Sequence, residues 1–185
     1  MLYDNIIIHF YNLNPLGRNE AYMILRILCV CKYNSCRSPM FVALLRREVL
    51  RRAEDYSAAK DLDMEEKLKH IGIESAGTFV NADMKQIGKP ASENAIACMG
   101  RLGLDITEHR SKSLASVDLK HFDLIVCVGN EEADIVTGLR PWGAVIVASA
   151  ATGGIPNPWR QNAETYEECA QKIETSAKAI VARFF

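Results

Sequence analysis

Residues 24–50 read ILRILCVCKYNSCRSPMFVALLRREVL. The stretch up to Val30 is apolar apart from one arginine, as in a buried strand, and the last eleven residues space their apolar side chains as an amphipathic helix does. Between them lies the loop Cys31-Lys-Tyr-Asn-Ser-Cys-Arg37. Ser38 then suits a helix N-cap, and Pro39 suits the first helical position. The pattern predicts a strand, a short loop and a helix that begins just past the loop.

The loop from Cys31 to Arg37 is suited to bind an oxyanion. At a strand-to-helix junction, the loop amides and the helix N-terminus point at one spot and favour negative charge. An arginine there can grip an oxyanion bidentately, and a thiol there favours its nucleophilic thiolate form. A cysteine and an arginine six positions apart also occur by chance, as a buried thiol beside a solvated arginine. Strand, loop, cap and helix together favour a thiolate that attacks a phosphate.

The composition is that of one globular domain. With 185 residues, 49% of them hydrophobic, the chain is long enough to bury a core. A net charge of −1 gives no basic field for nucleic acid, and no apolar run approaches the roughly 20 residues of a membrane span. Six cysteines without a secretory signal indicate reduced thiols in a cytoplasmic protein. The four histidines lack metal-ligand spacing, so we expect no metal or other cofactor.

Residues 1–22 differ in character from the rest. They hold a short apolar run, residues 6–10, and then an asparagine-rich stretch with Pro15 and Gly17. The run is too short for a signal peptide and has no basic segment before it. We interpret residues 1–22 as an extension that is dispensable for catalysis, either disordered or forming an extra strand. The domain itself then occupies residues 23–185.

Helical and strand-like segments alternate along this domain. Strands are expected over residues 24–30, 71–75, 122–128 and 144–149, and helices over 40–53, 90–102, 131–139 and 163–185. The charged stretch 54–70 either extends the first helix or follows it. Four strands separated by helices predict a single-domain α/β fold, with a four-stranded parallel sheet in the order 2-1-3-4 and helices on both faces. Ligands bind such sheets at the carboxyl ends of the strands, where Cys31 lies.

Further motifs follow the loop in order. They are Glu74-Ser-Ala-Gly-Thr78, Gly88-Lys-Pro-Ala91, His109-Arg110 before Ser113-Leu114, Asp123-Leu-Ile-Val126 and Ile155-Pro-Asn-Pro-Trp159. With the loop, they resemble the low-molecular-weight protein tyrosine phosphatases over roughly residues 24–185. The resemblance implies a phosphatase that acts on a phosphorylated protein or a small aryl phosphate through a cysteinyl-phosphate intermediate. We expect a monomer or weak dimer that binds neither nucleic acid nor a membrane.

The resemblance also implies roles for the loop residues. Cys31 would be the nucleophile, Arg37 the clamp on the phosphoryl oxygens, and Ser38 a hydrogen-bond donor to the thiolate. The backbone amides of the loop would complete the phosphate-binding site. The phosphate-binding residues would be Lys32, Tyr33, Asn34, Ser35, Cys36 and Arg37.

The surrounding residues are implied in the same way. Asn34, Ser75 and His109 would hold the loop in shape, although each could be an ordinary turn or surface residue. Tyr33 and Trp159 would line the substrate rim. Cys36 would form a reversible disulfide with the nucleophile, or it could simply be a small core residue.

Asn157 departs from the family pattern, because it stands where the family carries the aspartate that serves as general acid. An amide has no proton to give, and losing a general acid typically costs about 10² to 10⁴ in rate. One interpretation is that another carboxyl acts, and the candidates are Asp83, Glu164 and Glu167. The others are a weakened enzyme for good leaving groups, or a phosphate-binding module with little turnover. We favour residual phosphatase activity, because the nucleophile half of the site is intact.

Other departures concern the supporting structure. Tyr33 replaces a usual glycine, so either its backbone is strained at positive φ or its ring lines the pocket mouth. Gly129 stands where many relatives have an acidic residue, and the loop over residues 79–87 looks longer than usual. Ser35 is a small polar residue typical of bacterial members, including some that act on phosphoarginine, which we rank below phosphotyrosine because that reaction relies on the missing aspartate.

An arsenate reductase is the enzymatic alternative, since such enzymes share this fold and loop. They need two further cysteines that carry a disulfide out of the site. Cys127 ends the expected third strand without a partner cysteine in the next dozen residues, and Cys98 and Cys169 fit helix cores. The cysteine pattern therefore favours the phosphatase.

Overall fold

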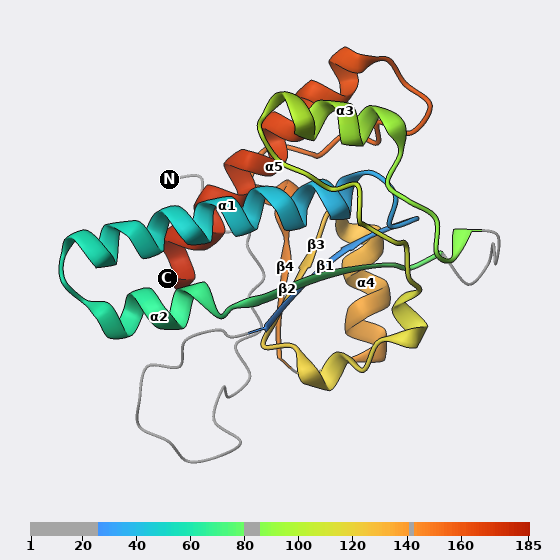
Figure 1. The fold of residues 1–185 in the computed structure, drawn as a ribbon. Helices are drawn as coiled ribbons and strands as arrows, with labels where there is room; N and C mark the ends of the chain where they lie inside the picture. Colours follow the sequence, from blue (N-terminus) through green and yellow to red (C-terminus); the bar gives the residue numbers. More distant parts are fainter. Residues whose placement is uncertain (1–25, 80–85, 141–142) are drawn as a thin grey trace.

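The computed structural model describes residues 26–79, 86–140 and 143–185, which form one sheet covered by helices (Figure 1). The strands are β1 (Arg26–Cys31), β2 (Gly72–Gly77), β3 (Leu124–Cys127) and β4 (Ala144–Val147). The helices are α1 (Arg37–Ala58), α2 (Leu62–Lys69), α3 (Glu93–Arg101), α4 (Asn130–Leu139) and α5 (Ala163–Phe184). Short 3₁₀ turns are η2 (Leu114–Ser116), η3 (Leu119–His121) and η4 (Ala148–Ala151). The predicted extension, Met23 and most of the 79–87 loop lie outside the described residues.

The sheet order is β2-β1-β3-β4, and all three pairings are parallel. The predicted fold class and strand order are confirmed. β1 lies in the middle, with Cys31 opposite Gly77 of β2 and Val30 opposite Cys127 of β3. The segments that leave β1, β2 and β3 therefore start side by side at one edge of the sheet.

Helices cover both faces of the sheet. Side chains of β1 alternate, so Ile27 and Cys29 join the core under α1, α3 and α5, whereas Leu28 and Val30 join a smaller core on the α4 side. Figure 1 shows α1, α3 and α5 together on one face and α4 on the other. β1 is buried between the two layers, which fixes the position of its carboxyl end.

The first helix begins earlier than its sequence suggests. α1 starts at Arg37, and Cys36 occupies the N-cap without a side-chain cap hydrogen bond. The prediction that Ser38 caps this helix is wrong, because the Ser38 side chain lies inside the first turn and contacts Cys31 and Asn34. Pro39 likewise lies in the first turn, where its missing N–H costs no helical bond.

The remaining helices differ from expectation mainly at their ends. The charged stretch both extends α1 to Ala58 and forms α2, which Asp61 caps through the Met64 amide. α3 begins at Glu93 rather than Pro90, because the Ser92 hydroxyl caps it by accepting from the Ala95 amide.

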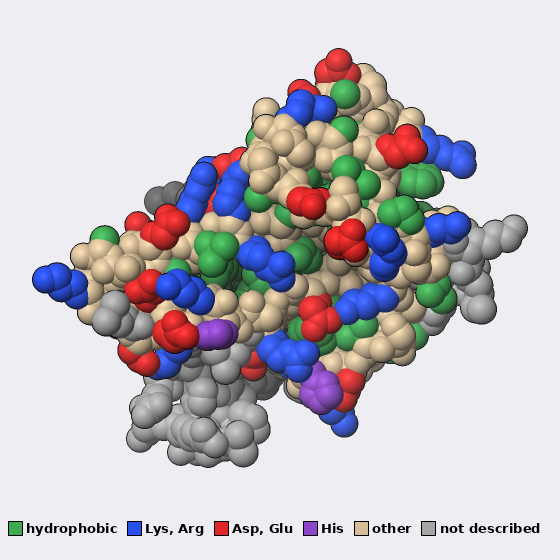
Figure 2. All heavy atoms as spheres, viewed as in Figure 1, with side chains coloured by type: hydrophobic (Ala, Val, Ile, Leu, Met, Phe, Trp, Pro, Cys, Tyr) green, Lys and Arg blue, Asp and Glu red, His purple; other side chains and the backbone are tan. Residues whose placement is uncertain are grey.

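The surface mixes both signs of charge. Figure 2 shows Lys and Arg side chains interspersed with Asp and Glu over the face in view, rather than gathered into one patch. Of the helices in the described ranges, none is both long and apolar enough to span a lipid bilayer.

Candidate active site

The loop after β1 is held between the ends of two strands. Cys31 is the last residue of β1 and is 2% exposed. Its carbonyl accepts from the Thr78 amide at 3.0 Å, and the Lys32 carbonyl accepts from the Phe79 amide at 2.9 Å. These bonds tie the start of the loop to the segment that follows β2, so the Cys31 thiol has a fixed position at the N-terminus of α1.

The Cys31 thiol contacts the Ser38 hydroxyl. Their Sγ and Oγ atoms lie 3.0 Å apart. The Asn34 Nδ2 donates to the same Ser38 oxygen at 2.8 Å. Because that oxygen already accepts a hydrogen bond, the serine's own hydrogen is free to point at the sulfur. A donor aimed at sulfur stabilises the thiolate over the thiol.

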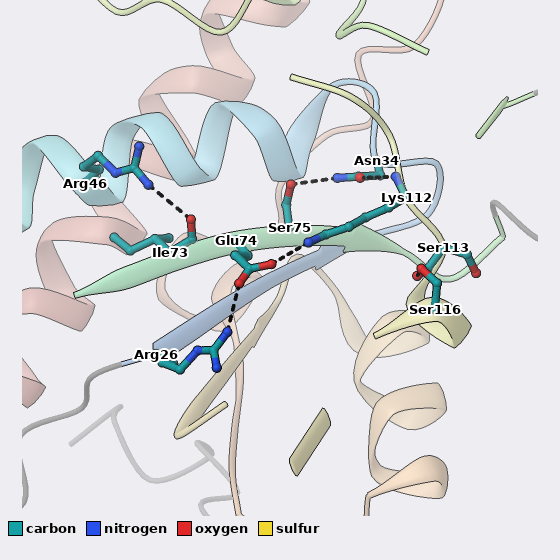
Figure 3. A network of polar contacts seen from close by, with 9 residues as sticks. All are labelled: Arg26, Asn34, Arg46, Ile73, Glu74, Ser75, Lys112, Ser113 and Ser116. Carbon is teal, nitrogen blue, oxygen red and sulfur yellow. Dashed lines mark hydrogen bonds and ion pairs between the residues drawn. The ribbon is translucent and has the colours of Figure 1, made fainter. Parts of the chain in front are cut away.

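Asn34 organises the loop from within. It is completely buried and adopts φ 52°, a left-handed conformation that asparagine tolerates better than most residues. Its Oδ1 accepts from the Lys112 amide at 2.9 Å, which fixes the orientation of the side-chain amide. The Nδ2 group must therefore face the hydroxyls, and it donates to Ser75 at 2.9 Å (Figure 3). It donates to Ser38 as well.

His109 contacts the same loop. Its Nε2 lies 2.6 Å from the Asn34 carbonyl oxygen. A carbonyl only accepts, so this ring nitrogen carries the hydrogen. Burial is the main reason that the pKa of His109 is lowered from 6.5, and the bond to Asn34 partly opposes the shift. The structure thus brings together all three residues predicted to support the loop, namely Asn34, Ser75 and His109.

A second cluster braces the support from outside. Glu74 on β2 pairs with Lys112 and, at 3.2 Å, with Arg26 (Figure 3). Lys112 first, and Arg26 after it, hold the pKa of the Glu74 carboxyl below its ordinary value. Since the Lys112 amide orients Asn34, these surface ion pairs help to place the segment that the amide belongs to.

Tyr33 is not strained. Among the described residues other than glycine, positive φ occurs at Asn34, Lys60 and Arg160, so the expectation of a strained Tyr33 is wrong. The loop places its left-handed turn one residue later, where asparagine suits it. The Tyr33 ring lies 6.3 Å from the Phe79 ring, and the Lys32 ammonium lies 4.4 Å from the centroid of the same Phe79 ring. Lys32 and Tyr33 of the loop thus form an aromatic and cationic group with Phe79, which follows β2.

Arg37 lies beside a carboxylate that the sequence reasoning did not identify. Its Nη2 is 3.8 Å from Oε1 of Glu132, and the two side chains are only 13% and 4% exposed. Glu132 is in the first turn of α4, which begins at the carboxyl end of β3. An acidic residue in the first helical turn after the third strand was the available signal.

Cys36 points into a separate polar cluster. Its Sγ lies 3.2 Å from the Ser92 hydroxyl and 3.4 Å from the Tyr166 hydroxyl, which are 3.1 Å from each other. Burial, and then the contact with Cys36, raises the pKa of Tyr166 to about 12, so it stays a phenol. Ser92 and Tyr166 had not been predicted as neighbours of the loop, since α3 and α5 bring them from 56 and 130 positions away.

The loop that carries Asn157 precedes α5. Asn157 is exposed, and its Oδ1 accepts from the Trp159 amide at 3.4 Å. Trp159 is 37% exposed, with the Arg160 guanidinium 5.9 Å from its ring centroid. These contacts hold the side chain of Asn157 within its own loop.

Two of the three alternative carboxyls lie within the described residues. Glu167 pairs with Arg101 of α3 at 2.9 Å. Glu164 is an exposed residue of the first turn of α5. Asp83 lies outside the described residues.

Comparison with known proteins agrees with this architecture. Residues 26–184 match the family of low molecular weight phosphotyrosine protein phosphatases. A probable low molecular weight protein-tyrosine-phosphatase, EpsP of Ralstonia nicotianae, is 29% identical over 164 residues, which cover 87% of this chain and 97% of the relative. The phosphatase Ptp of Acinetobacter johnsonii is 28% identical over 152 residues, 80% of this chain and 90% of the relative.

A solved structure extends the comparison to three dimensions. Wzb of Vibrio vulnificus, in complex with benzylphosphonate, has a TM-score of 0.69 and 25% sequence identity, and the match covers 85% of this chain and 97% of that one. A parallel sheet with a cysteine-and-arginine loop after its central strand defines a phosphatase-like α/β domain. The chain belongs to the low molecular weight protein tyrosine phosphatase family, as the sequence motifs predict.

Proposed function

We propose that the protein hydrolyses phosphotyrosine or other aryl phosphomonoesters through a cysteinyl-phosphate on Cys31. The observation that carries this proposal is the hydrogen-bond chain from Asn34 through Ser38 to the Cys31 sulfur. This chain supplies a donor to a sulfur at a helix N-terminus, which is what a nucleophilic thiolate needs. A merely structural buried thiol would not need this arrangement.

The proposed reaction has two steps. The Cys31 thiolate attacks phosphorus, the S–P bond forms, and the P–O bond to the aryl group breaks with release of the phenolate. Water then attacks the cysteinyl-phosphate, which gives inorganic phosphate and returns the electron pair to sulfur. Ser38 stabilises the sulfur anion at the start and at the end, when sulfur is the leaving group.

The loop would hold the phosphoryl oxygens during both steps. Amides from Lys32 to Arg37 and the first turn of α1 supply donors at the helix N-terminus. Arg37 adds a charged and bidentate donor. Transfer through a trigonal phosphoryl group is favoured by such positioning and charge stabilisation.

Asn157 sets the proposed limit on the rate. It cannot protonate the leaving oxygen, so the rate depends on how well the aryl group leaves unaided. We expect activated aryl phosphates to turn over readily and phosphotyrosine, whose phenol has a pKa near 10, to turn over slowly.

Aromatic side chains near the loop support the choice of an aryl phosphate as the substrate. Tyr33 and Phe79 lie beside the loop, and Trp159 is partly exposed in the loop of Asn157. Flat rings of this kind can pack on an aryl group. The Vibrio vulnificus relative is described in complex with benzylphosphonate, an aromatic phosphonate, which supports an aryl substrate here. A phosphorylated protein is the proposed partner, and phosphoarginine ranks lower because its chemistry relies on the missing aspartate.

A reductase activity is less well supported. Cys127 is completely buried, and burial raises its pKa, which opposes the thiolate that disulfide relay requires. Cys98 and Cys169 are buried in α3 and α5. All six cysteines are free thiols, which supports the proposed cytoplasmic location. The proposed oligomeric state is a monomer or weak dimer.

Turnover of p-nitrophenyl phosphate and of phosphotyrosine tests the proposal. We expect measurable hydrolysis of the activated ester and slower hydrolysis of phosphotyrosine, and we expect both to disappear in Cys31→Ser. Cys98→Ser is the matched control, because it changes another buried thiol outside the loop. If the wild-type protein turned over neither compound and still bound inorganic phosphate, it would be a binding module and not an enzyme.

A further inference from the structure

We propose that Glu132 is the positioning residue for Arg37, and that Gly129 is glycine in order to make room for its carboxylate. The proposal rests on the function proposed above, since it assigns a partner to the arginine that would clamp the phosphate. It concerns α4, an element on the opposite face of the sheet from α1.

The burial of Glu132 requires an explanation. Its side chain is 4% exposed, and a carboxylate almost never lies that deep without compensation. Removing a carboxylate from water costs several kcal/mol, and an opposite charge with further donors must offset that cost. The charged partner is Arg37, whose Nη2 lies 3.8 Å from Oε1. The second contribution is the N-terminus of α4, because Glu132 lies in its first turn, where negative charge is favoured.

Topology accounts for the meeting of these two residues. Arg37 begins the helix after β1, and Glu132 lies in the first turn of the helix after β3. β1 and β3 are parallel neighbours, so both helices begin at the same edge of the sheet. One helix contributes the cation and the other the carboxylate, although they cover opposite faces.

The absence of a side chain at Gly129 is explained by the nearby carboxylate and not by backbone conformation. Its φ of −152° is extended backbone that any residue adopts. A Cβ added there would lie 3.2 Å from the Glu132 Oε2, closer than side chains normally pack. A larger residue at position 129 would therefore push the carboxylate beside Arg37 out of its present position. The reverse also follows, because an aspartate at 129 would carry its own carboxylate to nearly the same place.

A carboxylate so near the phosphate site has two opposing effects. Its charge repels a bound phosphate, which weakens anion binding. By holding the guanidinium in one orientation, it also raises the fraction of molecules that are ready to bind, and the apparent affinity scales with that fraction. We infer that the second effect is larger, since a long arginine side chain left without a partner samples many rotamers.

This inference predicts the sign of the change in Glu132→Gln. Loss of the charge alone would tighten binding of inorganic phosphate, whereas loss of positioning weakens it. We expect binding to weaken by about tenfold or more, as when a competent state falls to a tenth of the population. The experiment is calorimetric titration with inorganic phosphate, followed by kcat and KM for p-nitrophenyl phosphate. Asp134→Asn is the control, because it removes the same charge from an exposed site on the same helix.

The position of the carboxylate is tested by moving it. Gly129→Asp alone should weaken phosphate binding, because two carboxylates crowd one place. Gly129→Asp combined with Glu132→Gln should recover most of the affinity lost in Glu132→Gln. Gly129→Asp would then weaken phosphate binding in the wild type and strengthen it in Glu132→Gln. This change of sign would indicate that the two carboxylates share one place beside Arg37, because a general loss of stability would weaken binding in both.

Two outcomes would overturn the inference. One is a folded Glu132→Gln protein that binds phosphate as tightly as the wild type or more tightly. The other is a double variant no better than Glu132→Gln. Thermal unfolding of each variant identifies any loss of fold, and Glu132→Asp provides a milder variant in that case. Failure of the proposed catalysis is distinguishable from failure of this inference. In that case the wild type would not turn over p-nitrophenyl phosphate, but the phosphate affinities of the variants would still differ as described.

Discussion

The Cys31 Sγ and the Ser38 Oγ lie 3.0 Å apart, and when the sulfur is a thiolate only the serine can donate the hydrogen between them. The Lys112 amide fixes the orientation of Asn34, and Asn34 in turn donates to Ser38, so the hydrogen of the serine stays available for the sulfur. A backbone amide on a neighbouring segment thus helps to orient the hydroxyl that faces the sulfur.

Ser38→Ala should slow both chemical steps, because both have negative charge on sulfur. A hydrogen bond to a charged group contributes about 1.5–3 kcal/mol, which corresponds to roughly 10- to 100-fold in kcat. Stopped-flow measurement with p-nitrophenyl phosphate should show a slower second step and an accumulated phosphoenzyme. Ser116→Ala is the control, since that exposed hydroxyl bonds only locally to the Ser113 carbonyl. An unchanged kcat in Ser38→Ala would show that the contact is structural only.

Asn34 substitutions should separate backbone strain from hydrogen bonding. Asn34→Ala leaves Ser38, Ser75 and the Lys112 amide without their partner, and it places alanine at φ 52°. Asn34→Gly loses the same bonds without the strain. We expect Asn34→Gly to lose about 2–3 kcal/mol of unfolding free energy and Asn34→Ala about 1 kcal/mol more, as measured by urea denaturation. Equal losses would mean that the left-handed conformation stores no strain.

The sequence was sufficient for the parts of this site that are contiguous. The strand, the loop and the presence of a helix after it follow from apolar periodicity, although the helix begins at Arg37 and not at the predicted Met40. The Ser38 cap was a wrong prediction because local propensity cannot show that a hydroxyl has a stronger partner across the loop. Tyr166 lay beyond sequence reasoning, because only the packing of α5 brings it to Cys36, and the one signal for Glu132 was its place in the first helical turn after the third strand.

His109 should make stability depend on pH. Burial lowers its pKa in the folded state, so protons bind more readily to the unfolded chain. Its contribution to stability is complete above pH 6.5, and it is lost as the pH falls from 6.5 toward the lower pKa of the folded state. The unfolding free energy, measured between pH 8 and pH 5.5, should decline less steeply in His109→Gln than in the wild type. His121→Gln, which changes an exposed ring, is the matched control. Parallel curves for His109→Gln and the wild type would rule out this linkage.

Cys36 should protect the nucleophile from irreversible oxidation. Hydrogen peroxide converts the Cys31 thiolate to a sulfenic acid, and attack by the Cys36 thiol then forms a disulfide and releases water. Peroxide-treated wild type should regain activity with dithiothreitol, whereas Cys36→Ser should stay largely inactive. Cys98→Ser should behave as the wild type, since its thiol lies in the α3 core. Full recovery of Cys36→Ser would show that Cys36 serves only the Ser92 and Tyr166 cluster.

Asn157→Asp should restore a proton donor and change the dependence on leaving group. The substitution is nearly isosteric, at an exposed site whose side chain bonds only to the Trp159 amide in its own loop. Tyrosine is a poor leaving group and nitrophenol a good one, so phosphotyrosine turnover should rise far more than nitrophenyl phosphate turnover. The rise has an upper limit of about 10² to 10⁴, the usual contribution of a general acid.

Asn162→Asp is the matched control, because it adds the same charge five residues later while keeping an oxygen that caps α5. Comparable effects on both substrates, or the same effect from the control, would mean that Asn157 does not occupy the acid position. A selective gain would show that the Cys31 loop is a competent nucleophile site, limited by the proton that its neighbour cannot supply.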